Sequence, residues 1–138
     1  MLVNMAPEST ELLTSHQSAL LHQGIDFFNQ GKFFDCHEVL EELWMECSGE
    51  RKKFLQGIIQ VAVAFHHLRN GNFVGASRLL SAGIEKIRSF DSNQQLIDLP
   101  PLFAALSPLH EKLQGGYAVS PSYPHPRISC LAPNGLNS

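Results

Sequence analysis

Apolar side chains recur through the first two thirds of the chain at spacings of three, four and seven residues, the period of helices that bury one side. This pattern predicts four helices, over residues 10–29, 33–47, 50–69 and 73–90. Ser9 or Thr10 can cap the first of them. Gly31 and Gly71 stand just beyond the first and third helices, where a glycine with a left-handed backbone commonly ends a helix. We therefore expect two helical hairpins, each with a glycine in its turn.

The third predicted helix is apolar on nearly every side. Such a helix is surrounded by neighbours instead of lying at the surface. We expect it at the centre of the domain, with Gly57 and Ala64 small enough to let a neighbouring backbone come close.

The C-terminal third of the chain has a different pattern. A fifth, shorter helical region is expected between residues 94 and 114, interrupted where Ser107 would cap a new helix that begins at Pro108. Prolines then recur among serine and asparagine, with few side chains able to pack. The sequence predicts three parts: a flexible arm over residues 1–9, a helical domain over residues 10–114 and a Pro-rich disordered tail over residues 115–138.

These elements predict an all-α fold, a compact bundle of about five helices built from helical hairpins. Residues 31–33, Gly-Lys-Phe, align with residues 71–73, Gly-Asn-Phe, so the hairpins form a weak internal repeat of tetratricopeptide type. His37-Glu38 in the first copy corresponds to Ser77-Arg78 in the second. The hairpin does not require the His-Glu pair, which favours a separate purpose for it.

Composition places the chain among ordinary globular domains. Its 138 residues are 43% hydrophobic and 17% charged, which suits one domain with a buried core. Ten Lys and Arg stand against 13 Asp and Glu, a net charge of −3, and the basic run over residues 51–53 is short. Nucleic-acid binding requires a larger basic surface, so we do not expect a nucleic-acid partner.

The cysteines and the hydropathy bear on location. Cys36, Cys47 and Cys130 are odd in number and lack paired spacing, which indicates reduced thiols in the cytoplasm. The N-terminus has no basic stretch followed by an apolar core, so no secretory signal is expected. The longest apolar-rich stretch, residues 58–68, falls well short of a membrane span. We expect a cytoplasmic protein without a membrane partner.

Candidate chemistry is concentrated in residues 33–44, FFDCHEVLEELW, which include the only tryptophan of the chain. On a helix, residues i and i+4 share a side, so His37 and Glu41 can meet each other or one ligand. Trp44 is expected at the edge of the same side, whereas Glu38 falls towards solvent. An imidazole beside carboxylates can ligate a metal or move a proton.

The third predicted helix adds a second set of polar side chains. Gln56 and Gln60 share a narrow polar stripe. His66 stands among apolar residues, where an imidazole must find a partner or stay neutral. Antiparallel packing of the second and third helices would bring His66 opposite the pair of His37 and Glu41.

This cluster has two interpretations. His37, Glu41, His66 and the two glutamines can form a buried hydrogen-bonded network that fixes helix packing. Alternatively, His37, Glu41 and His66 ligate a divalent metal such as Zn, Fe or Mn, and Glu38 or Glu41 is a catalytic base. The spacing lacks the second histidine of the metalloprotease motif His-Glu-x-x-His, so a protease of that kind is not expected.

Residues 24–90 carry three motifs in order: Phe34-x-x-His37-Glu38-x-x-Glu41-x-x-Trp44, then Gln56-Gly57-x-Ile59-Gln60-x-Ala62-x-Ala64-x-His66, then Gly71-Asn72-x-x-Gly75-Ala76. In this order and spacing they resemble the domain-of-unknown-function 309 family of small bacterial and archaeal helical proteins. The resemblance implies a compact all-α bundle and brings no established activity. The Pro-rich tail is not part of the family pattern.

Two functions are compatible with these observations. The first is a protein-interaction module, which presents a groove to a protein partner or to a second copy and uses the polar cluster for packing. The second is a metal-assisted hydrolase or related enzyme with the cluster as its site. No identified nucleophile or phosphate-binding loop selects a reaction.

Overall fold

The computed structural model describes residues 12–90 and 96–132. Its helices are α1 (Ser15–Asn29), α2 (Phe33–Met45), α3 (Gly49–Arg69), α4 (Phe73–Arg88) and α5 (Leu99–Gln114). The described residues contain no β-strand beyond one isolated bridge between Ile97 and Cys130. The predicted all-α class is therefore confirmed.

The first helix begins later than predicted. Its N-cap is Thr14, whose hydroxyl accepts a hydrogen bond from the N–H of Gln17 while the Gln17 side chain accepts one from the N–H of Thr14. This reciprocal capping box satisfies two amide groups that have no partner within a helix. Gln17, three residues after Thr14, is the sequence signal that distinguishes Thr14 from the predicted caps Ser9 and Thr10. The flexible arm predicted for residues 1–9, with Ser9 and Thr10, lies outside the described residues.

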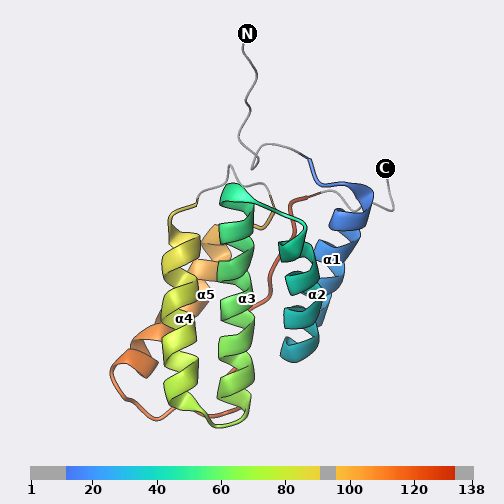
Figure 1. Cartoon of the computed structure of the whole chain (residues 1–138). Coiled ribbons are helices and arrows are strands. Elements are labelled where there is room, and N and C mark those ends of the chain that lie inside the picture. The colour runs from blue at the N-terminus through green and yellow to red at the C-terminus, as the bar shows by residue number, and fades with distance from the viewer. Residues whose placement is uncertain (1–11, 91–95, 133–138) are drawn as a thin grey trace.

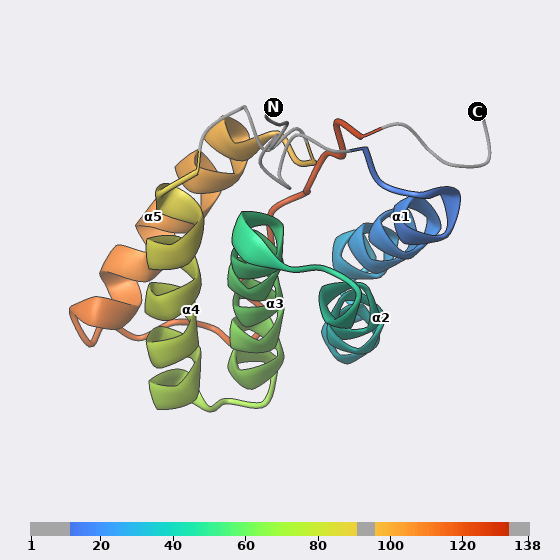
Figure 2. The ribbon, with the colours of Figure 1, turned by 45° about the horizontal axis from the view of Figure 1, so that its top comes forward.

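Helices α2, α3 and α4 lie side by side in one layer, with α3 in the middle (Figure 1). Figure 2 shows α1 and α5 on the other side of this layer, at opposite flanks. Phe54 and Phe65 of α3 are fully buried, as expected for a central helix. In the part of the chain that the structure describes, no helix is both long enough and apolar enough to cross a membrane.

The hairpins α1–α2 and α3–α4 share one turn. Gly31 and Gly71 have φ angles of +80° and +76°, which residues with a side chain rarely adopt. The N–H groups of Lys32 and Asn72, one position further on, each donate to a carbonyl five residues back, at 2.8 Å in both turns. This is a Schellman C-cap. The predicted repeat is thus present in the backbone.

Helices α3 and α4 approach most closely at a pair of glycines. A Cβ atom on Gly83 would lie 2.8 Å from the carbonyl oxygen of Gly57, and one on Gly57 would lie 2.6 Å from a methyl group of Ile87. Real Cβ atoms do not come so near. The close approach expected at Gly57 is confirmed, and it brings the two backbones together in the middle of the layer.

Helix α5 runs through Pro108 without interruption, which corrects the predicted break. The hydroxyl of Ser107 donates to the carbonyl of Phe103 at 2.9 Å and caps no new helix. A proline inside a helix removes one backbone hydrogen bond. Leu106 and Leu109, on either side of Pro108, are both buried, and their packing keeps α5 continuous.

Residues 117–132 pack against the bundle, which differs from the disordered tail predicted for residues 115–138. This stretch, called the C-terminal strap below, runs behind α3 between α1 and α5 (Figure 2). Val119 and Ile128 are buried in it. Residues 133–138 lie outside the described part of the chain.

Polar side chains of other elements hold the strap. Arg69, at the end of α3, donates through Nη1 to the carbonyl oxygens of Pro121 and Tyr123, both at 2.8 Å. His125 Nε2 donates to the carbonyl of Asn29 at 3.1 Å. The His125 ring packs on three buried phenylalanines of α1, α2 and α3, with centroids 5.2 to 6.4 Å apart. Amino-acid composition did not predict that residues 117–132 are ordered, because the residues that hold them come from distant parts of the chain.

Candidate functional site

Helix α2 brings His37 and Glu41 together, as their spacing predicts. His37 Nε2 lies 3.5 Å from Glu41 Oε2. The His37 side chain is 29% exposed and that of Glu41 54% exposed, so the pair is in contact with water. An exposed pair one helical turn apart contributes only about 0.3–0.5 kcal/mol to stability. The pair therefore contributes little to the stability of the fold.

His66 lies near this pair without joining it by a hydrogen bond. The ring of Phe34 adjoins both imidazoles, with its centroid 6.0 Å from that of His37 and 5.8 Å from that of His66. His66 Nε2 lies 3.4 Å from the side-chain nitrogen of Asn70, the C-cap residue of its own helix. The expected antiparallel packing of α2 and α3 holds, but the contact between the helices here is aromatic.

The other predicted residues form no hydrogen-bonded link between α2 and α3 in the described residues. Glu38 and Gln56 are exposed. The Trp44 Nε1 and Gln60 Oε1 atoms are buried without a hydrogen-bond partner in the described part of the chain. Trp44 packs at the edge of the core, and the Nζ atom of Lys52 lies 4.2 Å from the centre of its ring. The buried network that one interpretation required is not formed by these side chains.

The metal interpretation requires ligand atoms of His37, Glu41 and His66 to converge. In the described residues, the group that brings three ligand atoms within 4.8 Å of one another is a different one, formed by His16, Glu42 and Glu46. The predicted trio is not among such groups.

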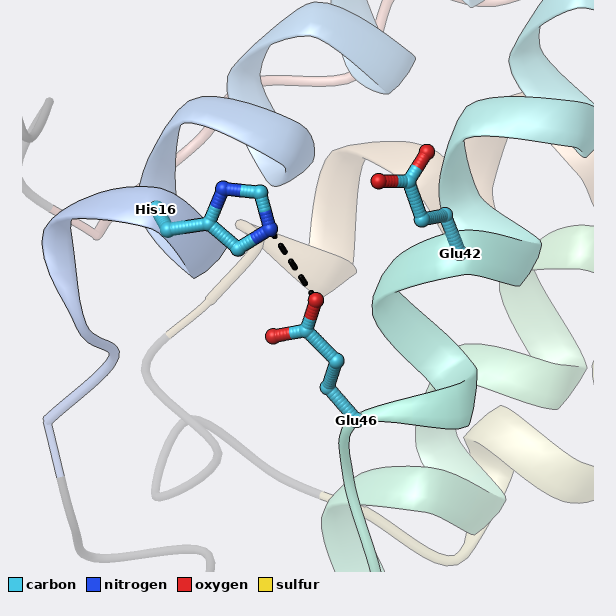
Figure 3. Close-up of side chains that lie close together, drawn as sticks. All are labelled: His16, Glu42 and Glu46. Atoms are coloured by element: carbon cyan, nitrogen blue, oxygen red, sulfur yellow. Dashed lines mark hydrogen bonds and ion pairs between the residues drawn. The ribbon is translucent and has the colours of Figure 1, made fainter.

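The group of His16, Glu42 and Glu46 joins the start of α1 to the end of α2 (Figure 3). His16 Nε2 lies 3.0 Å from Glu46 Oε2, and all three side chains are exposed. An imidazole and two carboxylates form a donor set that suits divalent cations such as zinc. The carboxylates were visible in the sequence one helical turn apart, but nothing there placed the first turn of α1 beside them.

The solvent side of α2 is rich in carboxylates. Its exposed carboxylates, with that of the C-cap residue, are Asp35, Glu38, Glu41, Glu42 and Glu46. The helix contains no lysine or arginine. Phe34 and Met45 are 54% and 69% exposed on the same helix. Phe34, Glu38, Glu41 and Met45 follow the spacing i, i+4, i+7 and i+11, so they form one stripe, called the outer stripe below.

The fold and motifs together define a small domain of helical hairpins, and part of it is similar to a known family. Residues 21–79 match the model of DUF309, whose description is "Domain of unknown function (DUF309)". The match covers the segment from α1 into α4 and confirms the resemblance drawn from the motifs. The description assigns no activity to the domain.

Two relatives extend the comparison. "Uncharacterized protein YpuF" of Bacillus subtilis (strain 168) is 39% identical over 66 residues, which are 47% of this chain and 38% of that protein. An "Uncharacterized protein" of Aquifex aeolicus (strain VF5) is 29% identical over 93 residues, which are 67% of this chain and 28% of that protein. The chain thus spans well under half the length of either relative, and neither name assigns an activity.

Proposed function

We propose that this domain is a protein-interaction module whose outer stripe on α2 binds a basic segment of a partner protein. The main support is the composition of the exposed side of α2. It combines four carboxylates within the helix and a fifth on the C-cap residue with two large exposed apolar side chains, and the helix between its caps has no lysine or arginine. Surfaces that combine exposed apolar groups with charge of one sign are typical of binding sites for amphipathic helices.

The apolar ends of the outer stripe provide anchors. Burying Phe34 and Met45 would remove apolar surface from water, which is favourable by roughly 25 cal/mol per Å². The two residues are about 16 Å apart along the helix axis at about 1.5 Å per residue, the length of three helical turns. A partner helix of three or four turns can therefore reach both. The flexible Met45 side chain can adapt to the partner's shape.

Charge indicates which kind of partner fits. Glu38 and Glu41 lie between the two anchors, so a matching segment places Lys or Arg there. A second copy of the chain docked through the same face would oppose two acidic stripes, which is unfavourable in a symmetric contact. Nucleic acid, itself anionic, is disfavoured by the same surface. A cytoplasmic location is part of this proposal and is supported by the three cysteines, none of which is joined in a disulfide in the described part of the chain.

An interaction module is preferred to a metal-assisted hydrolase because of the geometry around His37. A metal site at that position needs three converging ligand atoms, and His37 and Glu41 supply two. In an interaction module the partly exposed His37, the exposed Glu41 and the Phe34 ring belong to the contact surface itself. Their exposure is then expected.

Selection of displayed peptides on the immobilised full chain tests this proposal. The recovered peptides are expected to combine Lys or Arg with apolar residues at helical spacing. Synthetic copies, measured by fluorescence anisotropy, should bind more weakly as salt increases, because screening acts on exposed charges. The double variants Phe34→Ala/Met45→Ala and Glu38→Lys/Glu41→Lys should each lower affinity tenfold or more.

Matched variants elsewhere on the surface serve as controls. Glu111→Lys reverses an exposed carboxylate on α5, and Leu131→Ala removes an apolar side chain that is 52% exposed in the strap. Both should bind the peptides as the wild type does, and circular dichroism should show unchanged helix content in all variants. Peptides that bind Glu38→Lys/Glu41→Lys as tightly as the wild type would rule out the outer stripe as their site.

A further inference from the structure

A cleft of about 530 Å³ between α3 and α4 has a charge opposite to that of the chain. Its lining includes Lys52 and Lys53 from α3, Lys86 and Glu85 from α4, and Trp44 from α2. Three lysines against one glutamate leave an excess of positive charge in the cleft, whereas the whole chain has a net charge of −3. Such a local reversal of sign raises the concentration of anions at one place.

The lysines of the cleft are poorly neutralised by the protein. In the described residues Lys52 and Lys86 form no ion pair with a carboxylate, and the Nζ atom of Lys52 lies over the Trp44 ring instead. Lys53 reaches Glu50 at 4.0 Å, with both side chains more than half exposed. Ammonium groups that outnumber the carboxylates beside them repel one another, and a bound anion relieves that repulsion.

The start of α3 adds to the same field. Gly49 is the first residue of this 21-residue helix and lines the cleft. The N-terminal end of an α-helix carries a partial positive charge of about +0.5 and exposes N–H groups that have no partner within the helix. Glu50 in the first turn of α3 offsets part of this charge and pairs with Lys53. The remaining N–H groups and the lysines attract the same kind of ligand.

We propose that this cleft binds a small molecule bearing a phosphate or diphosphate group. Its volume lies within the range of small-molecule sites, roughly 300–1,000 Å³. Lysine is a frequent phosphate partner, and ammonium groups from two helices suit a ligand with more than one negative charge. Gln56, which also lines the cleft, can hydrogen-bond the rest of the ligand. This site is separate from the outer stripe, so each can fail without the other.

The only tryptophan of the chain lies in the wall of the cleft, which makes its fluorescence a direct reporter. The full chain is titrated with inorganic phosphate, pyrophosphate, AMP and ADP, with sodium sulfate at matched ionic strength as the control. Saturable changes with pyrophosphate and ADP that exceed those with sulfate are expected. Equal affinity for pyrophosphate and ADP would identify the phosphates as the recognised group. Tighter binding of ADP would mean that the cleft also contacts the nucleoside.

Two variants should shift the affinity in opposite directions. Lys86→Gln removes an ammonium group that does not contact the Trp44 ring, and it should weaken pyrophosphate binding about tenfold. Glu85→Gln removes the carboxylate that opposes anion binding, and it should strengthen pyrophosphate binding several-fold. Lys112→Gln, on the exposed side of α5, should leave it unchanged. A purely structural role for these residues would not produce opposite shifts.

Two results would overturn the proposal. One is a fluorescence change no larger than that with sulfate for every phosphate compound. The other is equal pyrophosphate affinity in the wild type, Lys86→Gln and Glu85→Gln. Isothermal titration calorimetry on the same samples guards against a binding event that leaves the fluorescence of Trp44 unchanged.

Discussion

Asn29 and Ile128 are 99 positions apart in the sequence and exchange two hydrogen bonds. Asn29 Nδ2 donates to the carbonyl of Ile128 at 2.9 Å, and the N–H of Ile128 donates to Asn29 Oδ1 at 2.8 Å. The end of α1 thereby sets the register of the C-terminal strap. Ile128 is buried as a result, and the His125 ring lies on the phenylalanines of the core.

Asn29→Ala removes both of these hydrogen bonds and leaves two backbone groups of Ile128 without partners. We expect the free energy of unfolding to fall by about 1–3 kcal/mol. Hydrogen exchange measured by mass spectrometry should become faster in residues 117–132. Gln23→Ala, at an exposed position of the same helix, is the control and should change neither quantity. Unchanged exchange in Asn29→Ala would mean that the strap is held by its other contacts.

Gly83→Ala should destabilise the contact between α3 and α4. Its new methyl group would lie 2.8 Å from the Gly57 carbonyl oxygen and 3.0 Å from a methyl of Val61, so the helices must separate. Overpacking of this kind costs about 1–3 kcal/mol, which exceeds the roughly 1 kcal/mol that alanine gains over glycine in helix propensity. Urea unfolding measures the difference. Ser77→Ala, a half-buried position of the same helix, should be neutral or stabilising.

The thiols of the buried Cys36 and the half-buried Cys130 should make stability depend on alkaline pH. Burial raises the pKa of Cys36 from 9.0 to about 12. Burial, with the nearby Asp26 carboxylate, raises the pKa of Cys130 from 9.0 to about 11. Above pH 9 the unfolded chain loses these protons while the folded chain keeps them, so the folded state binds more protons and stability falls as pH rises.

The contribution of the two protonated thiols to the free energy of unfolding is complete below about pH 9. It decreases as the pH rises from there to about 12 for Cys36 and to about 11 for Cys130. Urea unfolding at pH 8, 9 and 10 should therefore show a steeper loss of stability in the wild type than in Cys36→Ala/Cys130→Ala. The two proteins share every other ionisable group, so the comparison isolates the two thiols. Parallel pH profiles would contradict the assignment.

Added zinc should distinguish the two imidazole–carboxylate groups. His16 lies with two glutamates whose oxygens are already within 4.8 Å, whereas His37 has one. Because affinity rises with the number of converging ligands, His16→Ala should weaken zinc binding measured by calorimetry and His37→Ala should leave it unchanged. The opposite ranking would restore the metal site predicted at His37, Glu41 and His66.

Much of the candidate site was predictable because its contacts lie within one helix. His37 meets Glu41 because residues one turn apart share a helical face. The outer stripe follows from the same rule, since Phe34, Glu38, Glu41 and Met45 keep helical spacing. The exposure of Glu38 also followed from its position on the helix.

Contacts between helices were predicted less well. The sequence placed His66 opposite His37, but a shift of a few ångströms between α2 and α3 decides whether imidazole meets imidazole or meets Phe34. The cleft was missed for the same reason. Lys52 and Lys53 belong to a basic run that is too short for nucleic acid, and Lys86 stands more than 30 positions further on.

The sequence by itself determined the helices, their glycine turns and the hairpin repeat, because these depend on interactions between residues at most a few positions apart. Tertiary structure alone decided the course of residues 117–132, the continuity of α5 through Pro108, and which charged side chains meet. Each of these depends on partners distant in sequence, such as Asn29 for Ile128. Local composition carries no information about such partners, since the free energy that orders a polar segment comes from the surface against which it packs.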